Sequence, residues 1–218
     1  MTVADVRERI AAACGRAGRD PSDVLLVAVT KYVTVVEAAA LVADGVVDLG
    51  ENHAQQLRDR AQDPALAGVR WHAIGPLQTN KARYVARWAS AFHALDRVEV
   101  AAALSERRST DGAGPLGCYL QVNVAGEATK AGVAPSDVGD LLGACAALDG
   151  ITVVGLMAMP PAAARPEDSR PWFRQLAALA AEHGVSGLSM GTTGDFEVAV
   201  EEGATVVRVG SAVFAPST

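Results

Sequence analysis

The 218-residue chain lacks any block of basic residues, and its formal net charge is −6. Nucleic acids and anionic membranes attract basic surfaces, so we expect neither as a partner. Long apolar runs are also absent, because charged residues, Gly or Pro interrupt every hydrophobic stretch before the roughly 20 residues that cross a bilayer. Residues 1–9 are rich in charge and lack the apolar core of a signal peptide. These absences predict a cytoplasmic protein.

Cysteines and catalytic motifs are equally scarce. The three cysteines, Cys14, Cys118 and Cys145, are odd in number and far apart. This spacing suggests neither a disulfide framework nor a zinc site, and it predicts buried free thiols. The chain contains no His-Glu-x-x-His, no Walker-type glycine loop and no Gly-x-Ser-x-Gly. We therefore expect no metal site, and nucleotide-binding and serine-hydrolase functions lack support.

The chain does contain a regular alternation of two kinds of segment. Half of the residues are apolar and 20% are charged, which is enough for one sizeable hydrophobic core. Short β-branched runs predict eight strands, at Leu25–Lys31, Val46–Asn52, Val69–Gly75, Ala91–Asp96, Leu116–Val124, Ile151–Met159, Gly187–Gly191 and Thr205–Phe214. Longer stretches predict helices at Val3–Gly18, Val35–Ala43, Thr79–Trp88, Val98–Arg108, Ser136–Leu148, Pro171–His183 and Asp195–Glu202.

This alternation predicts the fold class. Strands and helices that alternate strictly require parallel strands with helical crossovers. Eight such units fit a closed barrel near its lower size limit of about 200 residues. We predict an α/β fold, a single-domain (β/α)8 TIM barrel over residues 1–218, with a helix in residues 1–20 packed on it. An open doubly wound sheet is the main alternative, but no Gly-x-Gly-x-x-Gly follows the first strand.

Two cations occupy positions where such a barrel carries function. Lys31 ends the first strand run and shares a face with Val27 and Val29, so its amine could form an imine with a carbonyl compound. A solvated loop lysine is the alternative. Arg208 interrupts an otherwise apolar run, where its guanidinium needs an acceptor. Either an internal carboxylate or a ligand would supply that acceptor.

Small and hydroxyl-bearing residues follow the last two strand runs. The loops Gly191–Asp195 and Gly210–Ser211 offer backbone N–H groups and hydroxyls, which is typical of the phosphate site of a barrel. Asn52 ends the second run and offers a donor and an acceptor to a ligand, with capping of the next helix as its alternative. His72, in the third run, is more typical of a core histidine than of a catalytic one.

Six segments carry a family resemblance. They are Val27–Lys31, Gly50–Asn52, Trp71–Lys81, Gln121–Val124, Gly155–Pro160 and Val207–Ser211. In this order, over nearly the whole chain, they resemble the pyridoxal phosphate homeostasis protein family, and the His-x-Ile-Gly-Pro-Leu-Gln-x-Asn-Lys block is the most specific of them. The resemblance implies a barrel like the N-terminal domain of alanine racemase that binds pyridoxal 5′-phosphate (PLP).

The same resemblance assigns roles to residues of this chain. It implies an imine between PLP and Lys31, with Arg208 facing the pyridine nitrogen. An arginine cannot accept the ring proton, so the pyridine stays uncharged and is a weaker electron sink. The other implied cofactor-binding residues are Asn52 near the ring, and Thr192, Thr193, Gly210 and Ser211 at the phosphate.

One loop departs from the family pattern. The family usually has Met-Ser-Asp-Asp after the glycine of the seventh strand, whereas this chain has Thr-Thr-Gly-Asp at residues 192–195. Thr193 keeps a hydroxyl where serine is usual, and Gly194 is expected to loosen the loop. Lys130 matches a family lysine that is suggested as a second position for handling the cofactor.

The resemblance implies a monomeric carrier that buffers PLP and hands it to PLP-dependent apo-enzymes, without robust catalysis. The chain ends before the β-domain that supplies the second base of alanine racemase, which disfavours two-sided proton transfer at an amino acid. A small racemase with Lys31 as its base is the alternative. A Schiff-base aldolase would share the lysine and the phosphate pocket, but would need neither bound PLP nor an arginine at a ring nitrogen.

Overall fold

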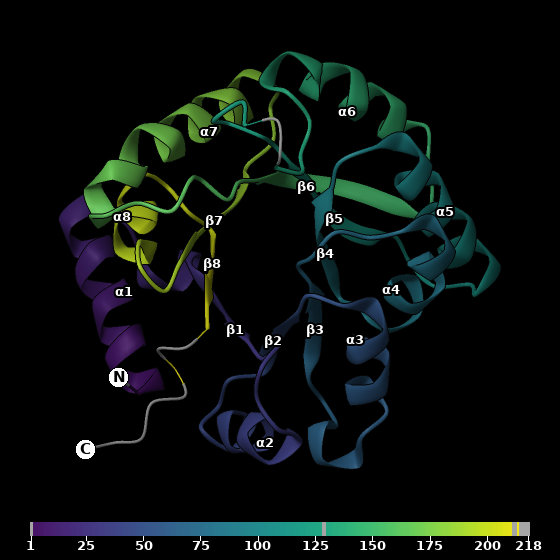
Figure 1. Ribbon diagram of the computed structural model, residues 1–218, viewed down its shortest axis with the longest axis horizontal. Helices are drawn as coiled ribbons and strands as arrows, with labels where there is room; N and C mark the ends of the chain where they lie inside the picture. Colours follow the sequence, from purple (N-terminus) through teal and green to yellow (C-terminus); the bar gives the residue numbers. More distant parts are fainter. Residues whose placement is uncertain (1, 128–129, 211–212, 214–218) are drawn as a thin grey trace.

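The described residues, 2–127, 130–210 and 213, form a closed barrel of parallel strands inside a ring of helices in this computed structural model (Figure 1). The strands are β1 (Leu25–Val29), β2 (Asp48–Glu51), β3 (Arg70–Ala73), β4 (Ala91–Leu95), β5 (Leu116–Gln121), β6 (Ile151–Met157), β7 (Gly187–Thr192) and β8 (Val206–Val209). They pair in that order, and β8 also pairs with β1. This closure confirms the predicted (β/α)8 barrel and shows that the open sheet is wrong.

The helices follow the strands along the chain. They are α1 (Val3–Ala17), α2 (Val35–Ala43), α3 (Ala54–Ala61), α4 (Ala82–Trp88), α5 (Val98–Thr110), α6 (Val138–Ala146), α7 (Arg170–Glu182) and α8 (Phe196–Glu201). Short 3-10 helices lie at η1 (Pro21–Asp23), η2 (Pro64–Leu66), η3 (Thr79–Lys81), η4 (Pro135–Asp137) and η5 (Pro166–Ser169). Helix α1 and the 3-10 helix η1 precede the first strand.

Local sequence explains where α1 begins and ends. Thr2 Oγ1 accepts a hydrogen bond from Asp5 N–H, and the Asp5 carboxylate accepts one from Thr2 N–H, which forms a capping box. The helix ends at Gly18, whose φ of 64° is left-handed. Arg19 then donates to Val200 O, in α8, at 2.6 Å. Helix α1 therefore packs against α8 on the outside of the barrel (Figure 1).

The predicted strand runs agree with the structure, with small differences at their ends. Strand β7 extends one residue beyond its predicted run, to Thr192, and β8 ends at Val209 although its run reaches Phe214. Residues 211–212 and 214 of that run lie outside the described residues. Helix α3 is additional to the predicted helices. Leu57 is the only large apolar residue in its sequence, AQQLRDRA, so no apolar period marks it.

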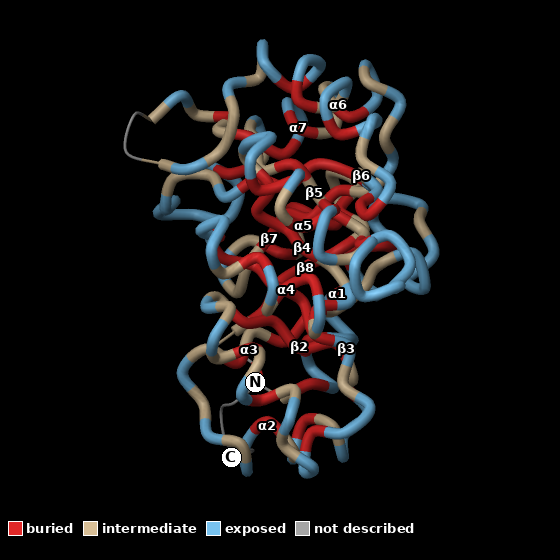
Figure 2. The backbone as a smooth tube through the Cα atoms, turned by 90° about the vertical axis from the view of Figure 1, so that its right-hand side faces the viewer, coloured by how far each residue is buried: buried red, intermediate tan, exposed pale blue. Residues whose placement is uncertain are grey.

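The strands form the core of the molecule. Strands β2 and β8 are buried along their whole length, as expected for parallel strands between an outer helix layer and a filled interior. Figure 2 shows buried residues gathered on the central strands and exposed residues on the outer helices. None of the described helices is long and apolar enough to cross a membrane.

The three cysteines are buried and free, which confirms the prediction made for them. Burial raises the pKa of the Cys118 thiol to about 12 and that of Cys145 to about 11. Both thiols therefore stay protonated at neutral pH and act as core residues.

Candidate functional site

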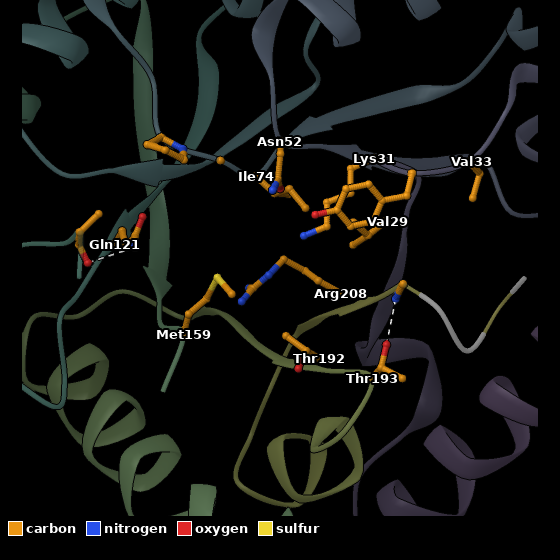
Figure 3. A pocket seen from close by; sticks show the side chains of 15 residues that line it. Val29, Lys31, Val33, Asn52, Ile74, Gln121, Met159, Thr192, Thr193 and Arg208 are labelled. Carbon is orange, nitrogen blue, oxygen red and sulfur yellow. Dashed lines mark hydrogen bonds between the residues drawn. The ribbon is translucent and has the colours of Figure 1, made fainter. Parts of the chain in front are cut away.

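A cavity of about 550 Å³ opens at the carboxyl ends of the strands (Figure 3). Its lining comes from segments that follow the first, second, third, fifth, sixth, seventh and eighth strands. Six of the seven predicted cofactor-binding residues line it: Lys31, Asn52, Thr192, Thr193, Arg208 and Gly210. The seventh, Ser211, lies outside the described residues. The fold thus brings the predicted residues to one place, where barrel enzymes hold their ligands.

Lys31 lies in the turn just after β1, on the same side as Val29, and both residues line the cavity. Its Nζ is 4.9 Å from the centre of the Tyr32 ring. The turn is anchored from α3, because Gln56 Nε2 donates to Lys31 O at 3.3 Å and the Arg60 guanidinium donates to Val33 O. Helix α3, which lies in none of the predicted helix ranges, therefore holds the backbone that carries the lysine.

Asn52 follows β2 and faces the same space as Lys31 (Figure 3). The N-cap of α3 is His53, so helix capping does not account for Asn52. Gly75, after β3, lies against Asn52: a Cβ at Gly75 would be 2.3 Å from Asn52 O. Only glycine permits this close backbone approach, which brings the ends of β2 and β3 together at the cavity wall.

Arg208 projects from β8 into the cavity and is 3% exposed. Its Nη1 donates to Ser189 Oγ at 2.5 Å and its Nη2 donates to Ala158 O at 3.1 Å. Both acceptors are neutral, and among the described residues Arg208 forms no ion pair, so the internal salt bridge considered from the sequence is wrong. Burial lowers the pKa of Arg208 to about 10, although the charge of Asp195 acts in the opposite direction. The guanidinium remains charged at neutral pH and has no anionic partner in the part of the chain that the structure describes.

The loop after β7 lies on the opposite side of the cavity from Lys31 (Figure 3). Thr192 N–H and Oγ1 donate to Asp195 Oδ1 at 2.7 and 3.1 Å, so Asp195 holds the loop on both sides of Gly194. The expected loosening at Gly194 is thus opposed by this carboxylate. Gly210 N–H donates to Thr193 Oγ1 at 3.1 Å, which leaves the Thr193 hydroxyl proton free to donate.

Lys130 lies at a neighbouring cavity of about 630 Å³ and is not in the lining of the Lys31 cavity. The two cavities share Met159 and Thr192. Lys130 Nζ is 3.4 Å from Glu127 Oε2, an exposed pair of low energetic value. A second cofactor position at Lys130 therefore stays a prediction.

A buried chain of polar side chains continues from Arg208 into the barrel, and sequence reasoning did not find it. Its members come from five strands: Ser189, His93, His72 and Asp48 follow Arg208 in that order. His72 is indeed a core histidine, as expected, but it is bonded to His93, which carried no site prediction. One signal was available for His93, which is the only polar residue in the strand sequence AFHAL.

Comparisons with known proteins agree with this geometry. Residues 3–218 match the family described as "Alanine racemase, N-terminal domain". The "Pyridoxal phosphate homeostasis protein" of Pseudomonas aeruginosa is 40% identical over 214 residues, which cover 97% of this chain and 93% of that protein. The protein of the same name from Aquifex aeolicus is 38% identical, covering 96% and 94%.

The solved structures that resemble this chain include a PLP-bound protein and an alanine racemase. PipY of Synechococcus elongatus PCC7942 with PLP bound has a TM-score of 0.82 and 30% identity, covering 96% of this chain and 100% of that one. Alanine racemase from Corynebacterium glutamicum has a TM-score of 0.63 at 19% identity, covering 98% of this chain and 61% of that one, so it shares the fold. The chain belongs to the pyridoxal phosphate homeostasis protein family, within the wider family of alanine racemase N-terminal domains.

Proposed function

We propose that this protein binds PLP through an imine on Lys31 and acts as a cofactor carrier in PLP homeostasis. The observation that carries the proposal is that Lys31 and a buried Arg208 without an anionic partner among the described residues line one cavity. The PLP bound to PipY, a relative at 30% identity, supports the choice of cofactor.

The cavity residues suit PLP chemically. When bound, PLP supplies an aldehyde carbon for attachment and a pyridine ring that withdraws electrons. The Lys31 amine can attack that aldehyde, and release of water completes the imine. Arg208 offers N–H groups to the ring nitrogen, and Asn52 offers an amide to a ring substituent.

Arg208 favours holding the cofactor over catalysis with it. A guanidinium can donate to the ring nitrogen but cannot accept its proton, so the pyridine stays uncharged. An uncharged ring stabilises a carbanion poorly, and racemisation needs that stabilisation. The racemase alternative therefore has less support from the cavity than the carrier does.

The phosphate side of the cavity suits release as well as binding. A phosphate that accepts from Gly210 N–H must replace Thr193 Oγ1 as the acceptor. When the phosphate leaves, Thr193 again satisfies that donor, so release does not leave the partly buried Gly210 N–H unpaired. Transfer of PLP to apo-enzymes by a monomeric cytoplasmic carrier, and a second cofactor position at Lys130, belong to this proposal.

The test uses the only three lysines of the chain, Lys31, Lys81 and Lys130. Full-length wild type and the variants Lys31→Ala, Lys81→Ala and Lys130→Ala are mixed with PLP, and the visible band of the protonated imine is recorded. We expect the band in every protein except Lys31→Ala. Borohydride reduction followed by peptide mass spectrometry should then place the pyridoxyl group on Lys31.

Two results would contradict the proposal. An imine band in Lys31→Ala equal to that of wild type would remove Lys31 from the attachment site, and a wild type without any band would remove the cofactor assignment. Steady interconversion of amino-acid enantiomers by the PLP-loaded protein would instead establish the racemase alternative.

A further inference from the structure

A chain of hydrogen bonds joins five side chains inside the barrel. Arg208 Nη1 is 2.5 Å from Ser189 Oγ, which is 2.7 Å from His93 Nδ1. His93 Nε2 is 2.9 Å from His72 Nδ1, and His72 Nε2 is 3.0 Å from Asp48 Oδ1. The chain thus runs from the cofactor cavity, lined by Arg208, to a separate cavity lined by Asp48.

The two ends limit how the protons between them can be placed. A guanidinium only donates, so Ser189 Oγ accepts from Arg208, and an ionised carboxylate only accepts, so His72 Nε2–H donates to Asp48. With one proton on each ring, His93 Nε2–H donates to His72 Nδ1 and the Ser189 hydroxyl donates to His93 Nδ1. A second proton on His72 would instead reverse the hydrogen bonds between His72 and His93 and between His93 and Ser189.

The carboxylate at the end of the chain is held in its ionised form. Arg70 donates to Asp48 from Nε and Nη2 at 2.8 and 2.5 Å. Burial alone would raise the pKa of Asp48, but the hydrogen bonds from His72 and Arg70 bring it down to about 2. Asp48 therefore accepts from His72 at any pH near neutrality.

The middle of the chain is packed so that it cannot rotate freely. Tyr119 stacks on His93 with ring centres 4.5 Å apart and planes at 21°. Gly187 leaves room for this ring, since a Cβ there would be 2.9 Å from Tyr119 Cε1. Burial, together with His72 and Arg208, lowers the pKa of His93 well below its ordinary value. His93 is thus a neutral ring locked between two hydrogen-bond partners.

We propose that Ser189, His93 and His72 are positioning residues that hold Arg208 as a donor toward the ring nitrogen of the bound cofactor. A guanidinium only donates, so a lone pair of Ser189 Oγ faces Arg208 Nη1, while Ala158 O accepts from Nη2. These two contacts orient the guanidinium plane. The inference rests on the proposed function, because it concerns the same site.

The first test determines, without any cofactor, which ring nitrogen of His72 and of His93 carries the proton. Side-chain ¹⁵N NMR of the full-length protein distinguishes the two neutral histidine tautomers, and His72→Gln and His93→Gln assign the signals. We expect His72 and His93 each to carry the proton on Nε2 at neutral pH. A proton on Nδ1 of either ring would overturn the proposal.

The second test reads the effect of the chain on Arg208 through bound PLP. His93→Phe keeps a ring but removes both hydrogen bonds, and Ser189→Ala removes only the link to Arg208. We expect either variant to weaken PLP binding about tenfold and to change both the imine absorption maximum and the pH at which the imine loses its proton. His93→Gln retains a donor and an acceptor and should restore part of each property. His183→Gln, at a half-buried position after α7 and outside this chain of hydrogen bonds, should match wild type.

The outcomes separate this inference from the proposed function. If wild type forms the imine and folded Ser189→Ala and His93→Phe bind PLP with the same affinity and spectrum, the chain does not position Arg208. If wild type itself forms no imine, the proposed function fails. The tautomer measurement still tests the hydrogen bonds among Ser189, His93 and His72. Should His93→Phe not fold, Ser189→Ala carries the same comparison.

Discussion

Strand β2 carries two buried carboxylates that face opposite sides of the barrel wall. Asp48 points inward and accepts two hydrogen bonds from Arg70 and one from His72. Glu51 points outward, where its Oε1 accepts from Thr30 Oγ1 at 2.5 Å and lies 3.3 Å from Arg60 Nη1. Neither Glu51 Oε2 nor Arg60 Nη1 has a hydrogen-bond partner among the described residues.

The two carboxylates differ in the direction of their pKa shifts, although both are buried. Burial is the largest influence on each and opposes the charged form. For Asp48 the hydrogen bonds from His72 and Arg70 outweigh it and lower the pKa to about 2. For Glu51, Thr30 and Arg60 do not outweigh it, and the pKa is raised. The number and geometry of donors, and not burial alone, decide which carboxylate stays ionised.

Among the changes considered for these two carboxylates, removal of Asp48 should have the largest effect on the free energy of unfolding. Asp48→Ala leaves the buried His72 N–H and the Arg70 guanidinium without their acceptor, and we expect it to lower the free energy of unfolding by about 3 kcal/mol at pH 7. Urea denaturation measures this loss. Asp59→Ala, which removes an exposed carboxylate, should change stability by less than about 0.5 kcal/mol. A loss below about 1 kcal/mol for Asp48→Ala would show that Asp48 is no better paired than Glu51.

The pH dependence of stability should reveal the low pKa of Asp48. Its folded pKa of about 2 lies below the ordinary 3.8, so the ionised group stabilises the fold above pH 4, and this contribution disappears as the pH falls toward 2. The difference corresponds to about 2 kcal/mol. We expect the stability gap between wild type and Asp48→Asn, measured in urea, to narrow by about this amount between pH 4 and pH 2. A constant gap would contradict the shifted pKa.

Neutralising Glu51 should have a smaller effect, with the opposite pH dependence. Because the folded pKa is above the ordinary 4.5, Glu51 favours the folded state at low pH, and this contribution declines as the pH rises through 4.5. We expect Glu51→Gln to change stability by less than about 1 kcal/mol at pH 7, because the loss of the ion pair with Arg60 is offset by removal of a buried charge whose Oε2 has no hydrogen-bond partner among the described residues. Relative to wild type, the variant should gain stability between pH 4.5 and pH 7. A loss as large as that of Asp48→Ala would show that Glu51 is as well paired as Asp48.

Lys31→Ala should have the smallest effect on stability while abolishing the imine. The amine lies at the cavity, 4.9 Å from the centre of the exposed Tyr32 ring. We expect a change below about 0.5 kcal/mol in urea. A loss near that of Asp48→Ala would mean that Lys31 supports the fold as well as the site.

Much of the site could be predicted from residue types and strand ends. Lys31 and Arg208 were found because each places a cation on the inward side of an apolar run, and the structure puts both at one cavity. Helix α3 could not be found in the same way, because its contacts with the Lys31 turn come from Gln56 and Arg60 in a polar segment. A polar helix that is buried by neighbouring elements has no apolar period to detect.

The polar chain was beyond sequence reasoning for a different reason. His72 and His93 are 21 residues apart, and Ser189 is 96 residues beyond His93. Neither separation matches a local spacing rule, and each residue alone is typical of an ordinary buried position. Their contact depends on the register between strands and on closure of the barrel.

The sequence by itself determined the alternation of strands and helices, the burial of the cysteines and the cavity position of Lys31 and Arg208. These properties follow from local periodicity, because the side-chain direction along a strand alternates with a period of two. Only the tertiary structure decided that Asp48 is fully paired while Glu51 is not, and that two histidines join Asp48 to Arg208. Hydrogen bonds depend on distances of a few tenths of an ångström between residues far apart in the chain, and only the closed barrel sets those distances.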